Sequence, residues 1–479
     1  MSRGLSEAGV TIGTSVGGEG PREACGLFGV WAPGEDVAKL TFFGLFALQH
    51  RGQESAGMAV SDGSRILVYR ELGLVSQVFD ERTLATLQGD LCIGHTRYST
   101  TGSTTWDNAQ PSFKTNGTRG LALGHNGNLV NTSELAIRVG QRSRASTDSD
   151  VVATLLARHL DRGLEQAAME ILPTLAGAFS FVIMDERTVY GARDPHGIRP
   201  LSIGRLGSGF CLASETCALD VVGATFVRDV EPGELVSIDQ RGIRSSMFAE
   251  SPARALCLFE FVYLSRPDSR MYGKSVHEAR REMGRRLAVE APVQADLVIP
   301  IPDTGHSAAQ GFAEVSGIAY GEGLMKNRYI GRTFIEPTPA LRSRGVKLKL
   351  NPLPDAIRGK RLVVVDDSIV RGTTTRQIVQ VLREAGAIQV HLRIVSPPIR
   401  WPCFYGIDMS TRAELIAAGA SVEGIRGFVG ADSLAYLTLE SLVAATGAPS
   451  SSFCRACFDG RYPVPVGEVE PSKFALETL

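Results

Sequence analysis

The segment Leu362–Gly386 constrains the fold of this chain more than any other. It begins with the apolar run Leu362–Val365, which is followed directly by two carboxylates, Asp366 and Asp367, and then by a loop of small and polar residues. The next residues have helical spacing, with an apolar face made of Ile378, Val381, Leu382 and Ala385, and Gly386 is placed to end that helix. A continuous apolar strand followed by a helix is typical of a parallel sheet covered on both faces. The sequence therefore predicts an α/β fold with both carboxylates at the carboxyl edge of a sheet, where such folds bind ligands.

The loop after the two carboxylates has the chemistry of a phosphate site. Its backbone N–H groups and hydroxyls would meet at the N-terminus of the helix, which favours an anion. The candidate residues are Ser368, Arg371, Gly372, Thr373 and Thr374. This segment is not a Walker loop, because it contains no Gly-Lys-Ser/Thr triplet. The alternative is a parallel strand with a capped helix, in which the acid pair only solvates the turn.

A second apolar run, Leu297–Ile301, ends in Pro-Asp-Thr-Gly and brings Asp303 and Thr304 to the same predicted edge. Taken alone, this loop would be an ordinary turn. Positive charge follows at Lys326, Arg328 and Arg332, which either contact phosphate or form a solvated basic face. The polar, basic, proline-containing segment 332–355 is predicted to be a mobile loop.

These segments closely resemble the phosphoribosyl-pyrophosphate motif of type I phosphoribosyltransferases. The resemblance implies that Asp366 and Asp367 hold the ribose hydroxyls and that the loop after them holds the 5′-phosphate. Asp303 and Thr304 would belong to the pyrophosphate loop. The positions associated with Mg²⁺ are Thr304, Asp366 and Asp367, which suits a hard ion that is held mainly by phosphate and water.

The other end of the chain carries a candidate nucleophile. Residues 1–24 form a Gly/Ser-rich leader without periodic apolar positions, which predicts disorder, and Ala24-Cys25 follows it. If the leader is removed there, Cys25 carries both a thiol and an α-amine that titrates near pH ~8 and can accept the thiol proton. The alternative is a small buried cysteine at the start of a strand.

Three Gly-containing polar motifs downstream, around residues 49–57, 94–102 and 124–128, match in order the class II glutamine amidotransferase domain. The resemblance implies that Arg97 holds the glutamine carboxylate and that Asp148 holds its α-amine. Asn126 and the Gly127 N–H would form the oxyanion hole. The histidines are interpreted as structural because the α-amine already supplies a base; they are His50, His95 and His125.

The pattern of predicted strands and helices changes near residues 245–255. Before that point, short β-like runs alternate with turns, and two helices are expected, one with Leu40, Phe43 and Ala47 on a face and one over Val151–Leu160. With the resemblances, we expect a mixed α/β and α+β chain: an N-terminal-nucleophile αββα sandwich followed by a phosphoribosyltransferase parallel-sheet domain. The predicted division is a propeptide (1–24), an amidotransferase domain (25–250), a phosphoribosyltransferase domain (251–460) and a tail (461–479).

The chain has eight cysteines in 479 residues, too few for a disulfide-built secreted scaffold. Cys92, Cys211 and Cys217 lie among apolar or small residues and are predicted to fill the core. Apart from Cys25, four cysteines remain, and they resemble the cluster-binding positions of the glutamine phosphoribosylpyrophosphate amidotransferase family; they are Cys257, Cys403, Cys454 and Cys457. Four thiolates can equally bind zinc, but the family pattern favours a structural [4Fe–4S] cluster.

An amidotransferase half followed by a phosphoribosyltransferase half resembles the glutamine phosphoribosylpyrophosphate amidotransferase family, specifically its cluster-containing members with a removed propeptide. The resemblance implies hydrolysis of glutamine at Cys25 and transfer of the ammonia to C1 of 5-phosphoribosyl 1-pyrophosphate, the first step of purine synthesis. It also implies feedback inhibition by purine nucleotides and a homotetramer. The alternatives are a non-catalytic sugar-phosphate sensor, which would not need the amidotransferase motifs, and other class II enzymes such as glucosamine-phosphate or asparagine synthases, which lack the acid-pair loop.

Charge and hydropathy exclude other classes of protein. The formal net charge is −1, so no global field attracts nucleic acid or anionic membrane. No apolar segment in the sequence reaches the length of a membrane helix, and the leader lacks the apolar core of a secretory signal. We therefore expect a cytoplasmic enzyme.

Overall fold

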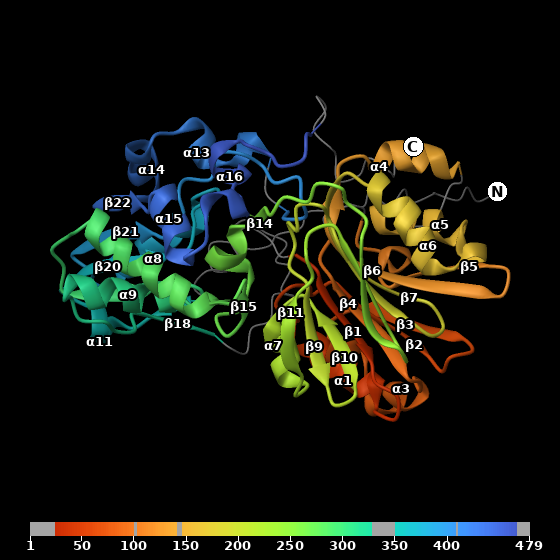
Figure 1. Cartoon of the computed structure of the whole chain (residues 1–479). Coiled ribbons are helices and arrows are strands. Elements are labelled where there is room, and N and C mark those ends of the chain that lie inside the picture. Colours follow the sequence, from red (N-terminus) through yellow and green to blue (C-terminus); the bar gives the residue numbers. More distant parts are fainter. Residues whose placement is uncertain (1–23, 100–102, 141–145, 328–349, 409–410, 467–479) are drawn as a thin grey trace, which may run out of the picture.

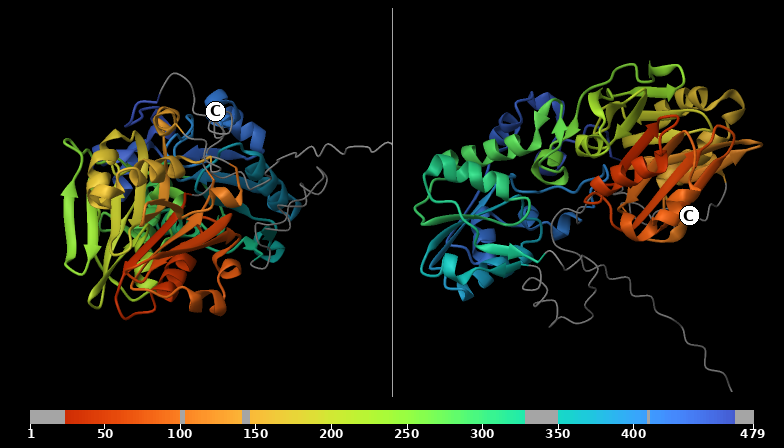
Figure 2. Two further views of the ribbon diagram at one scale, coloured as in Figure 1. Left: turned by 90° about the vertical axis from the view of Figure 1, so that its right-hand side faces the viewer. Right: turned by 90° about the horizontal axis from the view of Figure 1, so that it is seen from below.

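The computed structural model describes residues 24–99, 103–140, 146–327, 350–408 and 411–466. Two sandwiched antiparallel sheets form the first half of the chain, and a parallel sheet between helices forms the second (Figure 1). Seen from below, the two halves lie side by side (Figure 2).

The first antiparallel sheet has the strand order β11-β9-β10-β1-β4-β2-β3. Its strands are β1 (Gly26–Trp31), β2 (Ser55–Ser61), β3 (Ile66–Leu72), β4 (Leu91–Arg97), β9 (Ser202–Leu206), β10 (Gly209–Ala213) and β11 (Thr225–Asp229). The second sheet has the order β13-β12-β8-β7-β6-β5. Its strands are β5 (Ser112–Asn116), β6 (Arg119–Leu129), β7 (Gly177–Met184), β8 (Val189–Arg193), β12 (Glu234–Asp239) and β13 (Gly242–Met247).

The two sheets face each other across an apolar core, and a helical layer covers each outer face. Side chains such as Leu27 from β1 and Val182 from β7 meet between the sheets. The helices over the first sheet are α1 (Val37–Ala47), α2 (Val75–Val78), α3 (Glu81–Thr86) and α7 (Thr216–Val221). Those over the second are α4 (Thr132–Val139), α5 (Asp148–Ala157) and α6 (Leu164–Ile171). This arrangement is the predicted αββα sandwich.

The first predicted helix exists, and two of the three residues predicted for its apolar face, Leu40 and Ala47, pack against the core. The third, Phe43, is 48% exposed, while Thr41, Gly44 and Leu45 are buried. Gly44 lies so close to the ring of Phe28 that any side chain there would overlap it, and this close packing rotates the buried face of α1 away from Phe43. The second expected helix begins at Asp148 rather than Val151, because Thr147 caps it by accepting a hydrogen bond from Asp150 N.

The parallel sheet has the order β17-β20-β21-β22, with strands β17 (Leu297–Pro300), β20 (Arg361–Asp366), β21 (Gln389–Ile394) and β22 (Ser433–Tyr436). Alternate residues of β20 face opposite layers: Val363 and Val365 pack toward one helical layer, Leu362 and Val364 toward the other. The first layer contains α8 (Val276–Glu290), α9 (His306–Ser316) and α15 (Leu439–Thr446), and the second contains α12 (Thr373–Glu384) and α14 (Val422–Val429). Burial on both faces explains the continuous apolar run that the sequence analysis used.

Shorter elements complete this half. They are β14 (Leu256–Cys257), β15 (Arg270–Met271), β16 (Lys274–Ser275), β18 (Leu324–Lys326), β19 (Leu350–Pro352), α11 (Pro354–Ile357), α13 (Ile416–Gly419), β23 (Phe453–Cys454), α16 (Ala456–Asp459) and a π-helical turn at Glu260–Leu264. Most of the predicted mobile loop, residues 332–349, lies outside the described residues. Its end is not a loop: β19 pairs with β18, and α11 follows. The buried side chain of Leu324 anchors this pair in the core.

Candidate functional site

The candidate nucleophile, Cys25, directly precedes β1 and is 7% exposed. Its Sγ lies 3.4 Å from Tyr98 O, to which the thiol donates, and 3.5 Å from Tyr98 N. Burial raises the pKa of the Cys25 thiol to about 11, although the Tyr98 hydrogen bond and the Arg97 charge oppose the shift. In this environment the thiol is protonated at neutral pH, so it needs a base to become a nucleophile.

Two charged residues of the predicted glutamine site lie near this thiol. Arg97 ends β4, and its guanidinium contacts Ser103 O and the carboxylate of Glu54 (3.8 Å). Asp148 begins α5 and accepts hydrogen bonds from the backbone N–H groups of Leu129 and Ser149. Burial raises the pKa of Asp148, but the neighbouring His125 and these hydrogen bonds outweigh it and hold the pKa below its usual range. The site therefore presents a guanidinium, which can bind the carboxylate of an amino acid, and a carboxylate, which can bind its amine.

The predicted oxyanion residues, Asn126 and Gly127, lie in β6. The side chain of Asn126 is fully buried, and neither its Nδ2 nor its Oδ1 has a hydrogen-bond partner in the described part of the chain. A buried amide without a partner costs free energy, and such groups are concentrated at functional sites. Gly127 has φ of +149°, and a side chain there would overlap Ala178 O. The side-chain amide of Asn126 is therefore placed to donate to a ligand oxygen.

We predict that Asn126→Ala lowers kcat for glutamine hydrolysis by about a hundredfold to a thousandfold with a smaller change in KM, because an oxyanion donor acts mainly in the transition state. Steady-state assay of released glutamate measures both constants. A change in KM alone would instead place the amide in ground-state binding.

The three histidines are held by other protein groups. His95 is fully buried, its Nε2 lies 2.9 Å from the His125 carbonyl oxygen, and burial lowers its pKa to about 3. His125 Nδ1 contacts Asp148 and Ser149, and His50 Nε2 lies 2.7 Å from Glu215. Each ring thus contacts the framework around the site.

In the second half, Asp366 and Asp367 lie at the carboxyl end of β20, as predicted from the sequence. Both are buried, and burial together with the neighbouring Asp367 charge raises the pKa of Asp366 well above its usual range. Thr304 Oγ1 donates to Asp367 Oδ2 at 2.5 Å, so the pyrophosphate-loop candidate and the acid pair meet at one edge. Asp303 forms an ion pair with Lys326, while Arg328 and Arg332 lie outside the described residues.

The loop after the acid pair leads into α12. Gly372 is in the left-handed region with φ of +79° and precedes Thr373, the first helical residue. Ser368 Oγ donates to Asp367 Oδ1 at 2.5 Å, and Arg371 Nη2 lies 3.1 Å from Glu414. The loop, with Thr374 in the first turn of the helix, therefore surrounds a helix N-terminus that favours an anion.

The four remaining cysteines come together from three parts of the sequence. Cys257 in β14 pairs in register with Cys454 in β23, and Cys457 follows in α16. Burial, and then the charges of the other three cysteines, raise the pKa of Cys457 well above its usual range, so all four thiols lie near one another. Burial also raises the pKa of Cys257 to about 12. Cys403 is half-buried, and its Sγ lies 3.4 Å from Tyr405 N.

Comparisons with known proteins decide between the alternatives. A model of the glutamine amidotransferase domain matches residues 95–221. The amidophosphoribosyltransferase of Mycobacterium tuberculosis (strain ATCC 25618 / H37Rv) is 60% identical over 459 residues, which cover 93% of this chain and 87% of that protein. The Bacillus subtilis (strain 168) amidophosphoribosyltransferase is 47% identical over 456 residues, covering 94% and 96%. The chain belongs to the amidophosphoribosyltransferase family.

Solved structures agree with this assignment. The glutamine phosphoribosylpyrophosphate amidotransferase of B. subtilis, solved with ADP and GMP, superposes with a TM-score of 0.88 at 46% identity and covers 93% of this chain and 98% of that chain. Membership in the amidophosphoribosyltransferase family confirms the predicted fold and the predicted reaction: the chain is a glutamine-dependent transferase of the first step of purine biosynthesis. A non-catalytic sensor and the other class II enzymes are thereby excluded.

Sequence reasoning missed the residues that connect the amidotransferase and phosphoribosyltransferase parts. Tyr98 OH donates to Asp408 Oδ2 at 3.2 Å, and Asn128 Nδ2 donates to Phe404 O at 3.0 Å. Arg51 is fully buried and binds both oxygens of Glu260. One signal was available: Glu260 is a single acid in the apolar run Leu256–Leu264, and an acid in such a position needs a buried partner.

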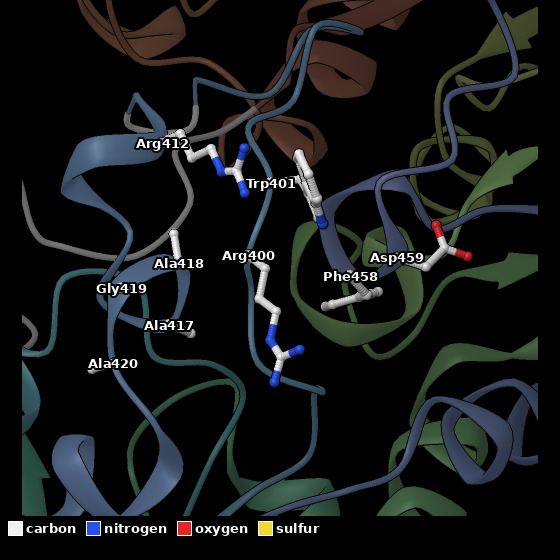
Figure 3. A pocket seen from close by; sticks show the side chains of 9 residues that line it. All are labelled: Arg400, Trp401, Arg412, Ala417, Ala418, Gly419, Ala420, Phe458 and Asp459. Atoms are coloured by element: carbon white, nitrogen blue, oxygen red, sulfur yellow. The ribbon is translucent and has the colours of Figure 1, made fainter.

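A pocket of about 530 Å³ lies beside α13, and its lining residues do not include the predicted substrate residues. In it, Arg412 stacks on Trp401 with 3.9 Å between the guanidinium carbon and the ring centroid (Figure 3). Its wall also includes Phe458 and Asp459, which directly follow Cys457. The pocket is therefore next to the four cysteines.

Among the described residues, no helix is long and apolar enough to span a membrane.

Proposed function

We propose that Cys25, once it is the first residue, attacks the amide carbon of glutamine while its own α-amine accepts the thiol proton. The amide nitrogen then takes up this proton, the C–N bond breaks, ammonia leaves, and water hydrolyses the resulting thioester to glutamate. Asn126 Nδ2 and the Gly127 N–H would donate to the developing oxyanion, and Arg97 and Asp148 would hold the two ends of the substrate. The observation that carries this proposal is the fully buried, unpartnered amide of Asn126 in β6, the strand that also contains Gly127.

The released ammonia would displace pyrophosphate from C1 of 5-phosphoribosyl 1-pyrophosphate, which gives 5-phosphoribosylamine. Asp366 and Asp367 would bind the ribose hydroxyls, and residues 368–374 would bind the 5′-phosphate at the N-terminus of α12. Asp303 and Thr304 would contact the pyrophosphate. Tyr98, which contacts Cys25, also binds Asp408 of the second half of the chain, and this contact supports direct passage of ammonia between the halves.

Mg²⁺ fits the acid pair. Two adjacent buried carboxylates repel each other, as the raised pKa of Asp366 reflects, and a divalent ion with bound phosphate would allow both to ionise. We propose that Thr304, Asp366 and Asp367 face this ion, which would neutralise charge on the leaving pyrophosphate.

The four cysteines fit a [4Fe–4S] cluster better than zinc. A single zinc ion holds its thiolates at Zn–S distances of about 2.3 Å. Among the residues that the structure describes, no three His, Cys, Asp or Glu side chains are grouped closely enough to hold one ion. A cube-shaped cluster separates its ligands more widely, and the register pairing of Cys257 with Cys454 places two of the four thiols on neighbouring strands that such a cluster would join. The cluster would join β14 to β23 and so would be structural.

We predict about four irons and four acid-labile sulfides per chain in anaerobically purified protein. Cys457→Ser should lose most of the iron together with thermal stability, because the cluster would tie the two-residue strands β14 and β23 together. Elemental analysis and sulfide assay test this, with Cys217→Ser as a matched buried-cysteine control. One zinc per chain without sulfide would contradict the cluster.

We also propose that residues 1–24 are removed, because the buried Cys25 thiol has a pKa of about 11 and needs its own α-amine as base. We predict that unprocessed protein does not hydrolyse glutamine. Its Cys25 should react with iodoacetamide at a rate that rises about tenfold per pH unit between about pH 7 and 10, because only the thiolate reacts. Processed protein should react faster at about pH 8 and show a shallower slope. N-terminal sequencing identifies the two forms, and equal profiles would contradict the role of the amine.

The remaining proposals rest on family resemblance. The division into residues 25–250 and 251–460 follows the change from antiparallel sheets to the parallel sheet. Inhibition by purine nucleotides is supported by the relative solved with ADP and GMP.

A homotetramer is consistent with the exposed Phe43 and Phe46 on α1, and light scattering would measure the oligomeric state. All eight cysteines lie in the described part of the chain as free thiols, which supports a reducing compartment such as the cytoplasm.

A further inference from the structure

Arg199 is a fully buried arginine whose guanidinium nitrogens face three different surroundings. Its Nε donates to Tyr405 O at 2.9 Å, and its Nη1 lies 3.3 Å from Glu260 Oε1. Its Nη2 is buried and has no hydrogen-bond partner among the described residues. Burying a guanidinium N–H without a hydrogen-bond partner costs free energy. We therefore expect this nitrogen to donate to a group other than the described residues.

The unpartnered nitrogen is in the neighbourhood of the four cysteines. The residue before Arg199, Ile198, accepts a hydrogen bond from Cys257 N at 3.0 Å. The residue that binds its Nε, Tyr405, donates its own N–H to Cys403 Sγ at 3.4 Å. Charges on Cys257, Glu260 and Cys403 favour the charged guanidinium and outweigh burial, so the pKa of Arg199 is raised. Arg199 is thus linked through Ile198 and Tyr405 to two of the four cysteines, Cys257 and Cys403.

A first route leads from Arg199 to the nucleophile. Glu260 Oε1, which contacts Arg199, also accepts from Arg51 Nη2 at 2.8 Å, and Glu260 Oε2 accepts from Arg51 Nη1 at 3.1 Å. Arg51 Nε in turn donates to the carbonyl oxygen of Cys25 at 3.2 Å. A second acid, Glu215, fixes Arg51 from the other side at 2.6 Å. Each charge in this buried chain has an opposite charge beside it, which makes the geometry stiff.

A second route runs through the backbone segment Cys403–Asp408. Arg199 holds this segment at Tyr405 O, one residue after the carbonyl that binds Asn128. Gly406 lies so close to the oxyanion residue Gly127 that a Cβ there would be 2.7 Å from the Gly127 carbonyl carbon. At its end, Asp408 binds Tyr98, whose backbone contacts the Cys25 thiol. A shift of Cys403 would therefore move a segment that lies directly on the oxyanion strand.

We propose that Arg199 is a positioning residue that donates its third N–H to sulfur at the four-cysteine site and thereby couples that site to the geometry of Cys25 and Gly127. This inference rests on the proposed function, namely that the four cysteines bind an iron–sulfur cluster. A cluster held by four thiolates carries net negative charge, and N–H···S bonds and nearby positive charge stabilise its reduced form. The same guanidinium then fixes Glu260 and Tyr405, so the cysteine site and the glutamine site share one rigid connection.

The test uses processed, anaerobically purified protein and the variants Arg199→Met and Arg199→Lys. Arg393→Met is the matched control, because Arg393 is also a buried arginine with hydrogen bonds but contacts Ala291, Leu392 and Ser433 instead. Iron and sulfide are counted first in every protein. The readouts are the midpoint potential of the cluster, the alkylation rate of Cys25, and kcat and KM for glutamine hydrolysis.

We expect Arg199→Met to shift the midpoint potential to more negative values, because the cluster loses a neighbouring positive charge. Its kcat for glutamine hydrolysis should fall by about tenfold or more, with a smaller change in KM and a changed alkylation rate, because the nucleophile is misplaced. Arg199→Lys should restore the midpoint potential more fully than the kcat. Lysine keeps the positive charge, but its single ammonium group cannot contact Tyr405, Glu260 and the cysteine site at the same time. Arg393→Met should lower thermal stability alone.

Glu260→Gln provides a second, nearly isosteric test if Arg199→Met does not fold. Loss of a negative charge near Cys257 should shift the potential in the opposite direction to Arg199→Met, while kcat for glutamine hydrolysis falls in both variants. Unchanged potential, alkylation and kcat in iron-replete Arg199→Met, with only a lower unfolding temperature, would overturn this inference and leave the cluster proposal intact. A parent protein without iron and sulfide would overturn both.

Discussion

Cys25→Ser will lose glutamine-dependent formation of phosphoribosylamine by about a thousandfold or more and will retain the reaction with free ammonia. The serine hydroxyl has a far higher pKa than a thiol, so the α-amine cannot activate it to the same extent. The fold should tolerate the change, because the two side chains are nearly the same size and the new hydroxyl could still donate to Tyr98 O, as the thiol does. The residues proposed to act on glutamine in this first chemical step all belong to the amidotransferase half.

Assays with glutamine and with ammonium chloride, each with saturating phosphoribosyl pyrophosphate and Mg²⁺, separate the two activities. Cys92→Ser is the matched control: it replaces another buried cysteine of the same sheet, at the position that pairs with Val30 of β1. The control should keep both reactions. Parallel loss of both in Cys25→Ser would place Cys25 in the shared framework instead of in the chemistry.

Asp366→Asn and Asp367→Asn should show the complementary pattern. Both should lower synthesis of phosphoribosylamine by about a hundredfold or more with either nitrogen source, because the carboxylates bind the sugar and face the divalent ion. Hydrolysis of glutamine should remain in both variants, since Cys25 and the oxyanion residues are unchanged. Asp220→Asn, on an exposed part of α7, is the control. Loss of glutamine hydrolysis to the same degree would show instead that the acid pair supports the whole fold.

The acid pair should also show a measurable conflict between stability and function. Burial and the charge of Asp367 raise the pKa of Asp366, so the folded state binds this proton more tightly than the unfolded state does. Stability from this group is therefore present at low pH and is lost as pH rises through the raised pKa. In Mg²⁺-free buffer at about pH 7, Asp366→Asn should unfold at a higher temperature than the parent, and the difference should shrink toward about pH 4. Calorimetry at several pH values tests the sign.

Local sequence was sufficient for the elements whose chemistry is contiguous. The acid pair follows β20 directly, and the phosphate loop follows the acid pair, so strand, loop and helix could be placed from one segment. Continuous apolar runs indicated a parallel sheet because β20 is buried on both faces. The amidotransferase residues were placed by motif resemblance, not by geometry, since Cys25, Arg97 and Asn126 come from three separate strands or strand ends.

Prediction failed where packing between distant elements decides orientation. The apolar spacing of Leu40, Phe43 and Ala47 indicated the buried face of α1, but Phe43 is exposed because the contact between Gly44 and Phe28 sets the orientation of the helix. The segment before Pro354 looked like a loop by composition, yet β19 finds a partner in β18, which lies well before it in the sequence. Helical periodicity reports only that a face exists, and strand pairing depends on a partner that the local sequence does not contain.

The sequence by itself determined the reaction class, the acid pair with its loop, the four cysteines and the candidate nucleophile, because each is a set of residue types in a recognisable order. Only the tertiary structure decided how these sites connect. Glu260 binds Arg51 across 209 residues of sequence, and Tyr98 binds Asp408 across 310. Such pairs are selected by the free energy of burying charge and polar groups together, which depends on three-dimensional proximity and leaves no local pattern.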